Sequence, residues 1–280
     1  MAEENLINGV VITFFSTASA VGKTLISVNM ASELAREGYS VCLLDMDLQF
    51  GDVSNYLKLN PIYTMADIQR MMQAENSDFK IYEFLTEYEH RGVAFHVLPA
   101  PLQLSEAYNI EPEIVESMVR DLQRYYDYII VDTTSMFSTL NMRLLDLSTI
   151  VTFLGIVDFI PTIKNMKIGN DTLRSLGYDS NKIRLVLNRS DAKSQISRAD
   201  VENLLEERFY HILPNDFRSA STSIKTGVPL VLSPDDSELA RALRSLVSLY
   251  TNKPVEYESI AEPGDISEEK SGGWLSKLFN

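Results

Sequence analysis

The sequence predicts an α/β fold with a doubly wound, mostly parallel sheet and helices on both faces. Short runs rich in Val, Ile, Leu and Phe alternate along the chain with longer amphipathic stretches. Strands that are buried on both faces of a parallel sheet have this continuous apolar character. Because parallel neighbours need a crossover between them, the alternation indicates right-handed strand–helix–strand units.

Each expected strand is a short apolar run, and each expected helix is an amphipathic segment that follows such a run. The first and fourth helices end before Gly38 and Gly177, since glycine readily takes the left-handed conformation that ends a helix. The expected strands are Val10–Phe15, Val41–Leu44, Val93–Leu98, Tyr128–Val131, Ile150–Leu154, Ile183–Leu187 and, more weakly, His211–Leu213. The expected helices are Thr24–Glu37, Glu111–Arg124, Leu140–Leu147, Pro161–Ser175, Arg198–Arg208 and Ser237–Tyr250.

Composition excludes several classes of protein. The chain has 280 residues, with 25 Lys and Arg against 39 Asp and Glu, and a formal net charge of −14. This balance argues against nucleic-acid binding through the overall field, so no specific nucleic-acid partner is expected. A single Cys excludes an internal disulfide framework and fits a reducing compartment. The first residues are acidic and polar and the apolar runs are strand-sized, so we expect a cytoplasmic protein.

The character of the sequence changes after Tyr250. We expect one domain over residues 1–250, a flexible acidic linker over 251–272 and an amphipathic tail over 273–280. Drawn as a helix, the tail places its large apolar side chains on one face, which suits a membrane surface. An intramolecular latch or a partner-binding peptide would use the same residues, which are Trp274, Leu275, Leu278 and Phe279.

A candidate phosphate site joins the first strand to the first helix. Gly22-Lys23-Thr24 matches the end of a P-loop, in which Lys reaches phosphate oxygens and the hydroxyl binds Mg²⁺. Thr17 stands where the general pattern has its first Gly, so a Ser- and Ala-rich turn that caps a helix is the alternative. The loop alone therefore leaves both interpretations open.

Acidic residues follow two of the expected strands. Asp132 ends the strand that begins at Tyr128, and Asp45 and Asp47 end the strand that begins at Val41. Doubly wound folds bind ligands at the carboxyl edge of the sheet, where these residues are expected. A lone Asp at the end of a strand usually caps a helix or lies in a solvated turn. Here the loop and the acidic residues occur together in this chain order, and the combination predicts a nucleotide site.

These residues resemble the deviant Walker A ATPases of the MinD/ParA group, which have the SIMIBI-type P-loop NTPase fold. Residues 47–53 are most similar to the CpaE/TadZ branch, which places type IV (Flp/Tad) pili at a site in the cell. The resemblance covers about Val10 to Tyr250. Its later matches are Leu185–Arg189, Leu213–Asp216 and Lys225–Leu230.

The resemblance implies an ATP- and Mg²⁺-binding homodimer that lies peripherally on the inner membrane face and positions pilus or secretion machinery. Lys23 would bind the β- and γ-phosphates, and Asp47 would orient the attacking water, which makes them the implied catalytic residues. The implied metal-binding residues are Thr24, Asp47 and Asp132. The implied nucleotide-binding residues are Ala20, Val21, Gly22, Lys23, Thr24, Leu25, Asn188, Arg189, Pro214 and Asp216, with Asn188 and Asp216 against adenine.

The chain departs from the family pattern in the loop. Where the family has Lys-Gly-Gly-x-Gly-Lys-Thr, residues 18–24 begin with Ala18, so the lysine that crosses the dimer interface in the family is missing. Loss of a cationic donor of the arginine-finger type costs about 10³–10⁵ in rate, and the sequence leaves ATP hydrolysis open. A catalytically silent scaffold and a cell-division or chromosome-partitioning ATPase are the alternatives.

A second departure follows Asp132. The family usually has Pro-rich small residues there that sense the γ-phosphate, whereas this chain has Thr133-Thr134-Ser135-Met136-Phe137. The hydroxyls could still respond to phosphate. Met136 and Phe137 suit a surface that docks a partner, although packing under the next helix would explain them equally well.

Overall fold

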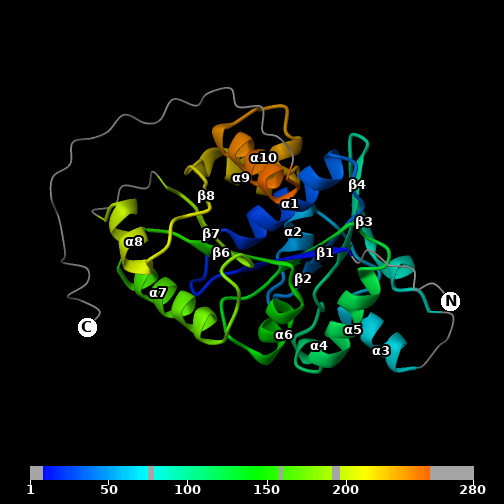
Figure 1. Cartoon of the computed structure of the whole chain (residues 1–280). Helices are drawn as coiled ribbons and strands as arrows, with labels where there is room; N and C mark the ends of the chain where they lie inside the picture. The colour runs from blue at the N-terminus through cyan, green and yellow to red at the C-terminus, as the bar shows by residue number, and fades with distance from the viewer. Residues whose placement is uncertain (1–8, 75–78, 158–159, 191–195, 253–280) are drawn as a thin grey trace, which may run out of the picture.

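The structure is a computed structural model and describes residues 9–74, 79–157, 160–190 and 196–252. Its eight-stranded sheet has the order β3-β4-β2-β5-β1-β6-β7-β8 (Figure 1). Among these strands, β3 and β4 pair antiparallel and the other neighbours pair parallel. The strands are β1 (Val10–Phe15), β2 (Val41–Asp45), β3 (Thr86–His90), β4 (Val93–Leu98), β5 (Tyr128–Asp132), β6 (Ile150–Gly155), β7 (Ile183–Leu187) and β8 (His211–Ile212).

Helices cover both faces of this sheet. In Figure 1, α1, α9 and α10 lie along the top, and α3 to α6 lie along the bottom with α7 and α8 to the left. The α-helices are α1 (Lys23–Arg36), α2 (Val53–Leu57), α3 (Met65–Gln73), α4 (Leu104–Ala107), α5 (Pro112–Leu122), α6 (Thr139–Leu147), α7 (Ile160–Ser175), α8 (Arg198–Leu205), α9 (Phe217–Thr226) and α10 (Glu238–Tyr250). Two 3₁₀ turns, η1 (Ile81–Phe84) and η2 (Leu230–Leu232), complete the described elements.

The apolar core divides at the sheet. Side chains alternate along each strand, so Ile12 and Phe14 of β1 pack with α1 and α10, whereas Val11 and Phe15 face the helices on the other side. All four are fully buried. β1 therefore lies at the centre of the fold, and its carboxyl end is held from both faces.

The predicted doubly wound fold is confirmed, and each predicted strand is present to within one residue at either end. Gly38 and Gly177 have φ of +94° and +84° after α1 and α7, as predicted. The strand β3 was missed because its sequence, Thr-Glu-Tyr-Glu-His, is polar and buries only Tyr88. The sequence prediction also lacked α2, α3, α4 and α9, and it extended α8 to Arg208, whereas Glu206 ends that helix with a left-handed φ of +55°.

Strand register brings the candidate residues to one edge. Asp45 pairs with Asp132 across β2 and β5, and Asp132 pairs with Phe14 of β1. The loop that leads into α1 begins directly after Phe15, so it starts beside Asp132, and Asp45 lies one strand further away. In the part of the chain that the structure describes, none of the helices has the length and apolar character needed to cross a membrane.

Candidate nucleotide-binding site

The loop of residues 16–22 connects β1 to α1 and leaves the start of the helix open to an anion. Gly22 is left-handed, with φ +98°, and a Cβ there would lie 2.7 Å from Asn188 Nδ2, so glycine is required. No described side chain caps α1, and its first turn holds no acid. The amides of Lys23, Thr24 and Leu25 have no partner within the helix, which favours a negatively charged ligand.

Lys23 is the first residue of α1, and its side chain reaches the loop that follows β5. Its Nζ donates a hydrogen bond to Ser135 Oγ at 2.8 Å and lies 3.5 Å from Ser16 Oγ. Both hydroxyls donate to the carbonyl oxygen of Ala18, Ser16 at 2.6 Å and Ser135 at 2.8 Å. Burial lowers the pKa of Lys23, and the negative charges of Asp132 and Asp47 oppose this shift.

Asp132 lies beside Thr24 at the end of β5. The Thr24 side chain hydrogen-bonds its carboxylate, while Asp132 Oδ1 is buried without a hydrogen-bond partner. Burial raises the pKa of Asp132 to about 7, against the lowering effects of Thr24 and Lys23. A hydroxyl beside an unpaired carboxylate oxygen fits Mg²⁺, which takes oxygen ligands and keeps several waters. Clusters of three or more His, Cys, Asp or Glu placed to hold a metal are absent from the described residues.

The two acids after Leu44 have different surroundings. Asp45 is 1% exposed, and its carboxylate accepts hydrogen bonds from the amides of Asp47 at 3.2 Å and Val53 at 3.1 Å. A Cβ on Gly51 would lie 2.6 Å from Asp45 Oδ2, so the loop needs glycine there to close over the carboxylate. Asp47 is half-buried and acts electrostatically on Lys23 and Asp132. Asp45 therefore braces the loop, whereas Asp47 Oδ1 accepts a hydrogen bond from the amide of Phe50 at 3.2 Å.

Residues predicted to contact the base follow β7 and β8, and two of them also hold the loop. Asn188 Nδ2 donates to the carbonyl of Val21 at 2.8 Å, and Arg189 Nη2 donates to that of Ala20 at 3.1 Å. Pro214 and Asp216 follow β8, which pairs with β7. Asp216 Oδ1 accepts from the amide of Ser219 at 3.0 Å and so caps α9. Of these four residues, Asn188 and Arg189 therefore contact the loop directly.

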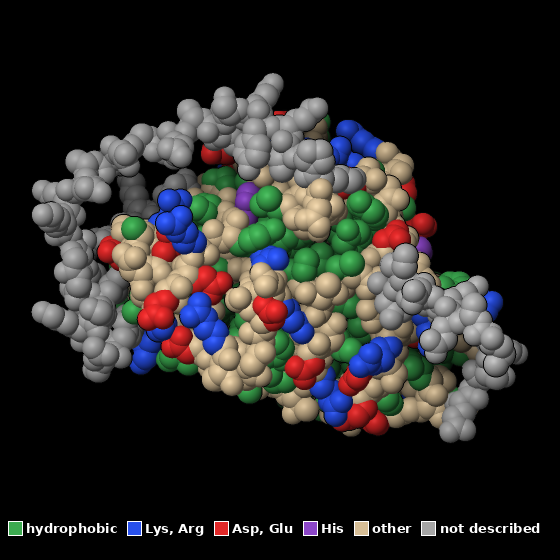
Figure 2. Space-filling view, in the orientation of Figure 1, with side chains coloured by type: hydrophobic (Ala, Val, Ile, Leu, Met, Phe, Trp, Pro, Cys, Tyr) green, Lys and Arg blue, Asp and Glu red, His purple; other side chains and the backbone are tan. Residues whose placement is uncertain are grey.

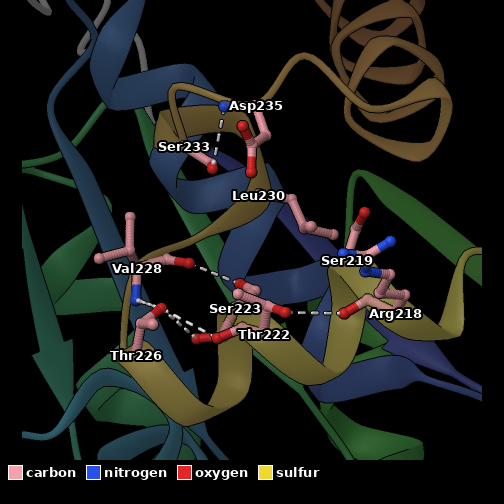
Figure 3. Close-up of a pocket in the computed structure, with 9 residues that line it drawn as sticks. All are labelled: Arg218, Ser219, Thr222, Ser223, Thr226, Val228, Leu230, Ser233 and Asp235. Carbon is pink, nitrogen blue, oxygen red and sulfur yellow. Dashed lines mark hydrogen bonds between the residues drawn. The ribbon is translucent and has the colours of Figure 1, made fainter.

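A hollow of about 440 Å³ lies elsewhere, between α9 and the segment from Val228 to Asp235 (Figure 3). Thr222 and Thr226 donate their hydroxyl hydrogens to carbonyls of α9 itself, and buried Ser223 donates to Val228. The nine residues drawn in Figure 3 include none of the predicted nucleotide-binding residues. We therefore place the candidate site at the loop of residues 16–22.

Sequence reasoning did not identify two of the residues that organise this site. The sequence pattern marks Ser16 only as part of the loop, and Ser135 only as one hydroxyl in a segment that departs from the family pattern. The departure from the family pattern after Asp132 is the signal that points to Ser135. Ser135 follows β5, which is the neighbour of β1 in the sheet, and so lies near the loop that follows β1.

The fold and the loop define a P-loop nucleotide-binding protein with a doubly wound sheet. More specifically, the chain belongs to the CobQ/CobB/MinD/ParA nucleotide binding domain family, whose model matches residues 12–229. This family membership agrees with the MinD/ParA-type ATPase resemblance of the sequence.

Individual relatives are similar to this chain over most of its length. The septum site-determining protein MinD of Thermotoga maritima is 24% identical over 249 residues, which cover 84% of this chain and 88% of that protein. A ParA family ATPase from Chlorobium tepidum has a TM-score of 0.77 at 21% identity, covering 86% of this chain and 98% of that one. MinD from Pyrococcus horikoshii, solved with Mg-ADP, has a TM-score of 0.73 at 18% identity, covering 86% and 96%. At these identities the solved structures show the fold.

Proposed function

We propose that this protein is a nucleotide-dependent switch ATPase that binds ATP and Mg²⁺ at the loop of residues 16–22. The observation that carries the proposal is the convergence of Lys23, Thr24 and Asp132 at the open start of α1, with one Asp132 oxygen buried and unpaired. In this assignment Lys23 binds the β- and γ-phosphates, while Thr24 and Asp132 hold Mg²⁺, which neutralises phosphate charge. Asp47 orients the attacking water.

The remaining residues complete the proposed nucleotide site. Backbone amides over residues 20–25 surround the phosphates, and Asn188, Arg189, Pro214 and Asp216 lie on the side of the adenine. The direct test is a calorimetric titration of the protein with Mg-ATP and Mg-ADP, with Mg-CTP as the control for base recognition. Binding of the adenine nucleotides in the micromolar range supports the proposal, and absence of binding to any nucleotide rejects it.

The carboxyl edge of the sheet also offers a surface for contact with another protein chain. Phe50, Leu102 and Met136 follow β2, β4 and β5, and their side chains are 71%, 73% and 64% exposed. Figure 2 shows hydrophobic side chains gathered across the middle of the face it presents, with charged side chains along the lower rim. Exposed apolar surface of this kind is typical of protein interfaces. We assign this edge to the homodimer and to a protein of the pilus or secretion machinery, which is the partner that the resemblance to the CpaE/TadZ branch implies.

A protein of the same fold also binds a protein partner. MinD of Aquifex aeolicus, which has a TM-score of 0.70 at 19% identity and covers 90% of this chain, was solved in a complex with MinC. In the proposed switch, ATP favours the dimer, and the dimer presents two tails to the cytoplasmic face of the membrane. One tail binds weakly, because its four apolar side chains offer at most about 6–12 kcal/mol against the cost of ordering the segment.

Deleting residues 273–280, which lie outside the described residues, is expected to abolish binding to lipid vesicles while nucleotide affinity stays unchanged. The four apolar side chains of this tail supply the proposed attachment, and the acidic linker opposes approach to an anionic surface. Co-sedimentation with vesicles of mixed neutral and anionic lipid, with and without Mg-ATP, measures the effect. Equal sedimentation of the full chain and the deletion variant would reject the membrane assignment.

Ala18 favours a second candidate, a scaffold that binds nucleotide without hydrolysing it. Replacing Ala18 with Lys restores the family's cationic donor and is expected to raise ATP turnover by at least about 10-fold if the missing charge limits the rate. Phosphate release measures this, and Ala18→Met controls for side-chain size. Unchanged turnover in both variants would favour the scaffold.

A further inference from the structure

Ser135 makes two contacts that join segments far apart in the sequence. Its hydroxyl accepts a hydrogen bond from Lys23 Nζ at 2.8 Å and donates one to the carbonyl of Ala18 at 2.8 Å. We infer that Ser135 is a positioning residue for Lys23, which holds the ammonium group over the loop in the orientation that phosphate binding requires. This inference rests on the proposed nucleotide-binding function.

The contacts leave Lys23 able to bind phosphate. An ammonium group has three donors, and Ser135 takes one of them at a full hydrogen-bond distance. Ser16 Oγ lies further away, at 3.5 Å, and is engaged with the same Ala18 carbonyl. Donors therefore remain for phosphate oxygens, while the long side chain has fewer conformations to lose on binding.

Ser135 also compensates for the composition of the loop. Ala18 and Ala20 stand where the family pattern has Lys and Gly, and Ala20 takes a left-handed φ of +57°. The hydroxyls of Ser16 and Ser135 lie 3.1 Å apart and hold the Ala18 carbonyl between them. The Ser135 hydroxyl thereby ties the backbone of Ala18 to the segment that follows β5.

The segment around Ser135 is itself well anchored. Thr133 donates its hydroxyl to the carbonyl of Phe14 at 2.7 Å, and buried Asn141 donates to Thr134 Oγ1 and to the carbonyl of Met136. A rigid support is what a positioning residue needs, because a mobile hydroxyl would not fix the lysine. Thr139, the first residue of α6, is exposed and carries a hydroxyl, so it offers a matched control.

The experiment compares Ser135→Ala, Ser135→Thr and Thr139→Ala with the unmodified protein by titration with Mg-ADP. We expect Ser135→Ala to weaken binding by about 10-fold, because the lysine loses its acceptor and the loop loses one of its two ties. Ser135→Thr keeps the hydroxyl and is expected to bind within about twofold of the unmodified protein, as is Thr139→Ala. The thermal stability of each variant is measured in parallel.

Each outcome separates the inference from the function on which it rests. If the unmodified protein does not bind Mg-ADP, the proposed function fails. If it binds and Ser135→Ala binds equally well or more tightly, the positioning role is wrong. A loss shared by Ser135→Thr or Thr139→Ala, or accompanied by a matching loss of thermal stability, would show general damage to the segment and would also overturn the inference.

Discussion

Replacing Lys23 with Met is expected to lower the affinity for Mg-ATP by at least about 100-fold. Methionine has a similar length but carries neither charge nor hydrogen-bond donors, so the contacts to the β- and γ-phosphates are lost. Hydrogen bonds to charged groups contribute about 1.5–3 kcal/mol each, and two of them exceed the roughly 2.8 kcal/mol that a 100-fold change represents. Isothermal titration calorimetry measures the change directly.

The Lys23→Met variant is expected to fold. Burial already lowers the pKa of Lys23, so removing its ammonium group relieves a desolvation cost while it leaves Asp132 and Asp47 without the nearby cation. Lys164→Met is the matched control, because Lys164 is exposed on α7. Equal affinities of the two variants for Mg-ATP would contradict the role of Lys23 and the placement of the nucleotide.

The sequence predicted the sheet because its central strands are buried on both faces. Continuous apolar runs such as Ile129–Val131 have no other stable location, and all three of these residues are fully buried. β3 and α9 carry weaker signals: β3 is polar, and α9 is rich in Ser and Thr and fully buries only Ser223. The secondary structure of such elements depends on packing against neighbouring elements, which the pattern of a single sequence does not show.

The candidate site could be predicted only where its residues are local. Lys23 and Thr24 follow a strand within one motif, and strand order explains why Asp132 joins them. The separate roles of Asp45 and Asp47 depend on the turn that brings the Val53 amide back to Asp45. The contact of Ser135 with Lys23 spans 112 positions and depends on side-chain conformations that the sequence pattern does not specify.

A buried polar network links three helices around the site, and Asn29 of α1 is at its centre. Asn29 Nδ2 donates to Tyr56 Oη of α2 at 3.2 Å, and its Oδ1 accepts from the amide of Val231 at 3.1 Å. Tyr56 Oη in turn lies 2.7 Å from Ser223 Oγ of α9. The network therefore joins the helix that follows the loop of residues 16–22 to the helices that follow Asp52 and Asp216.

Replacing Asn29 with Ala is expected to lower the free energy of unfolding by about 3 kcal/mol. The change leaves the Val231 amide buried without its acceptor, removes a partner of Tyr56 and opens a cavity at a fully buried position. Urea denaturation measures the loss, with Asn203→Ala on the exposed side of α8 as the control. A loss below about 1 kcal/mol, equal to that of the control, would mean that water satisfies these groups and that the network does not hold the three helices together.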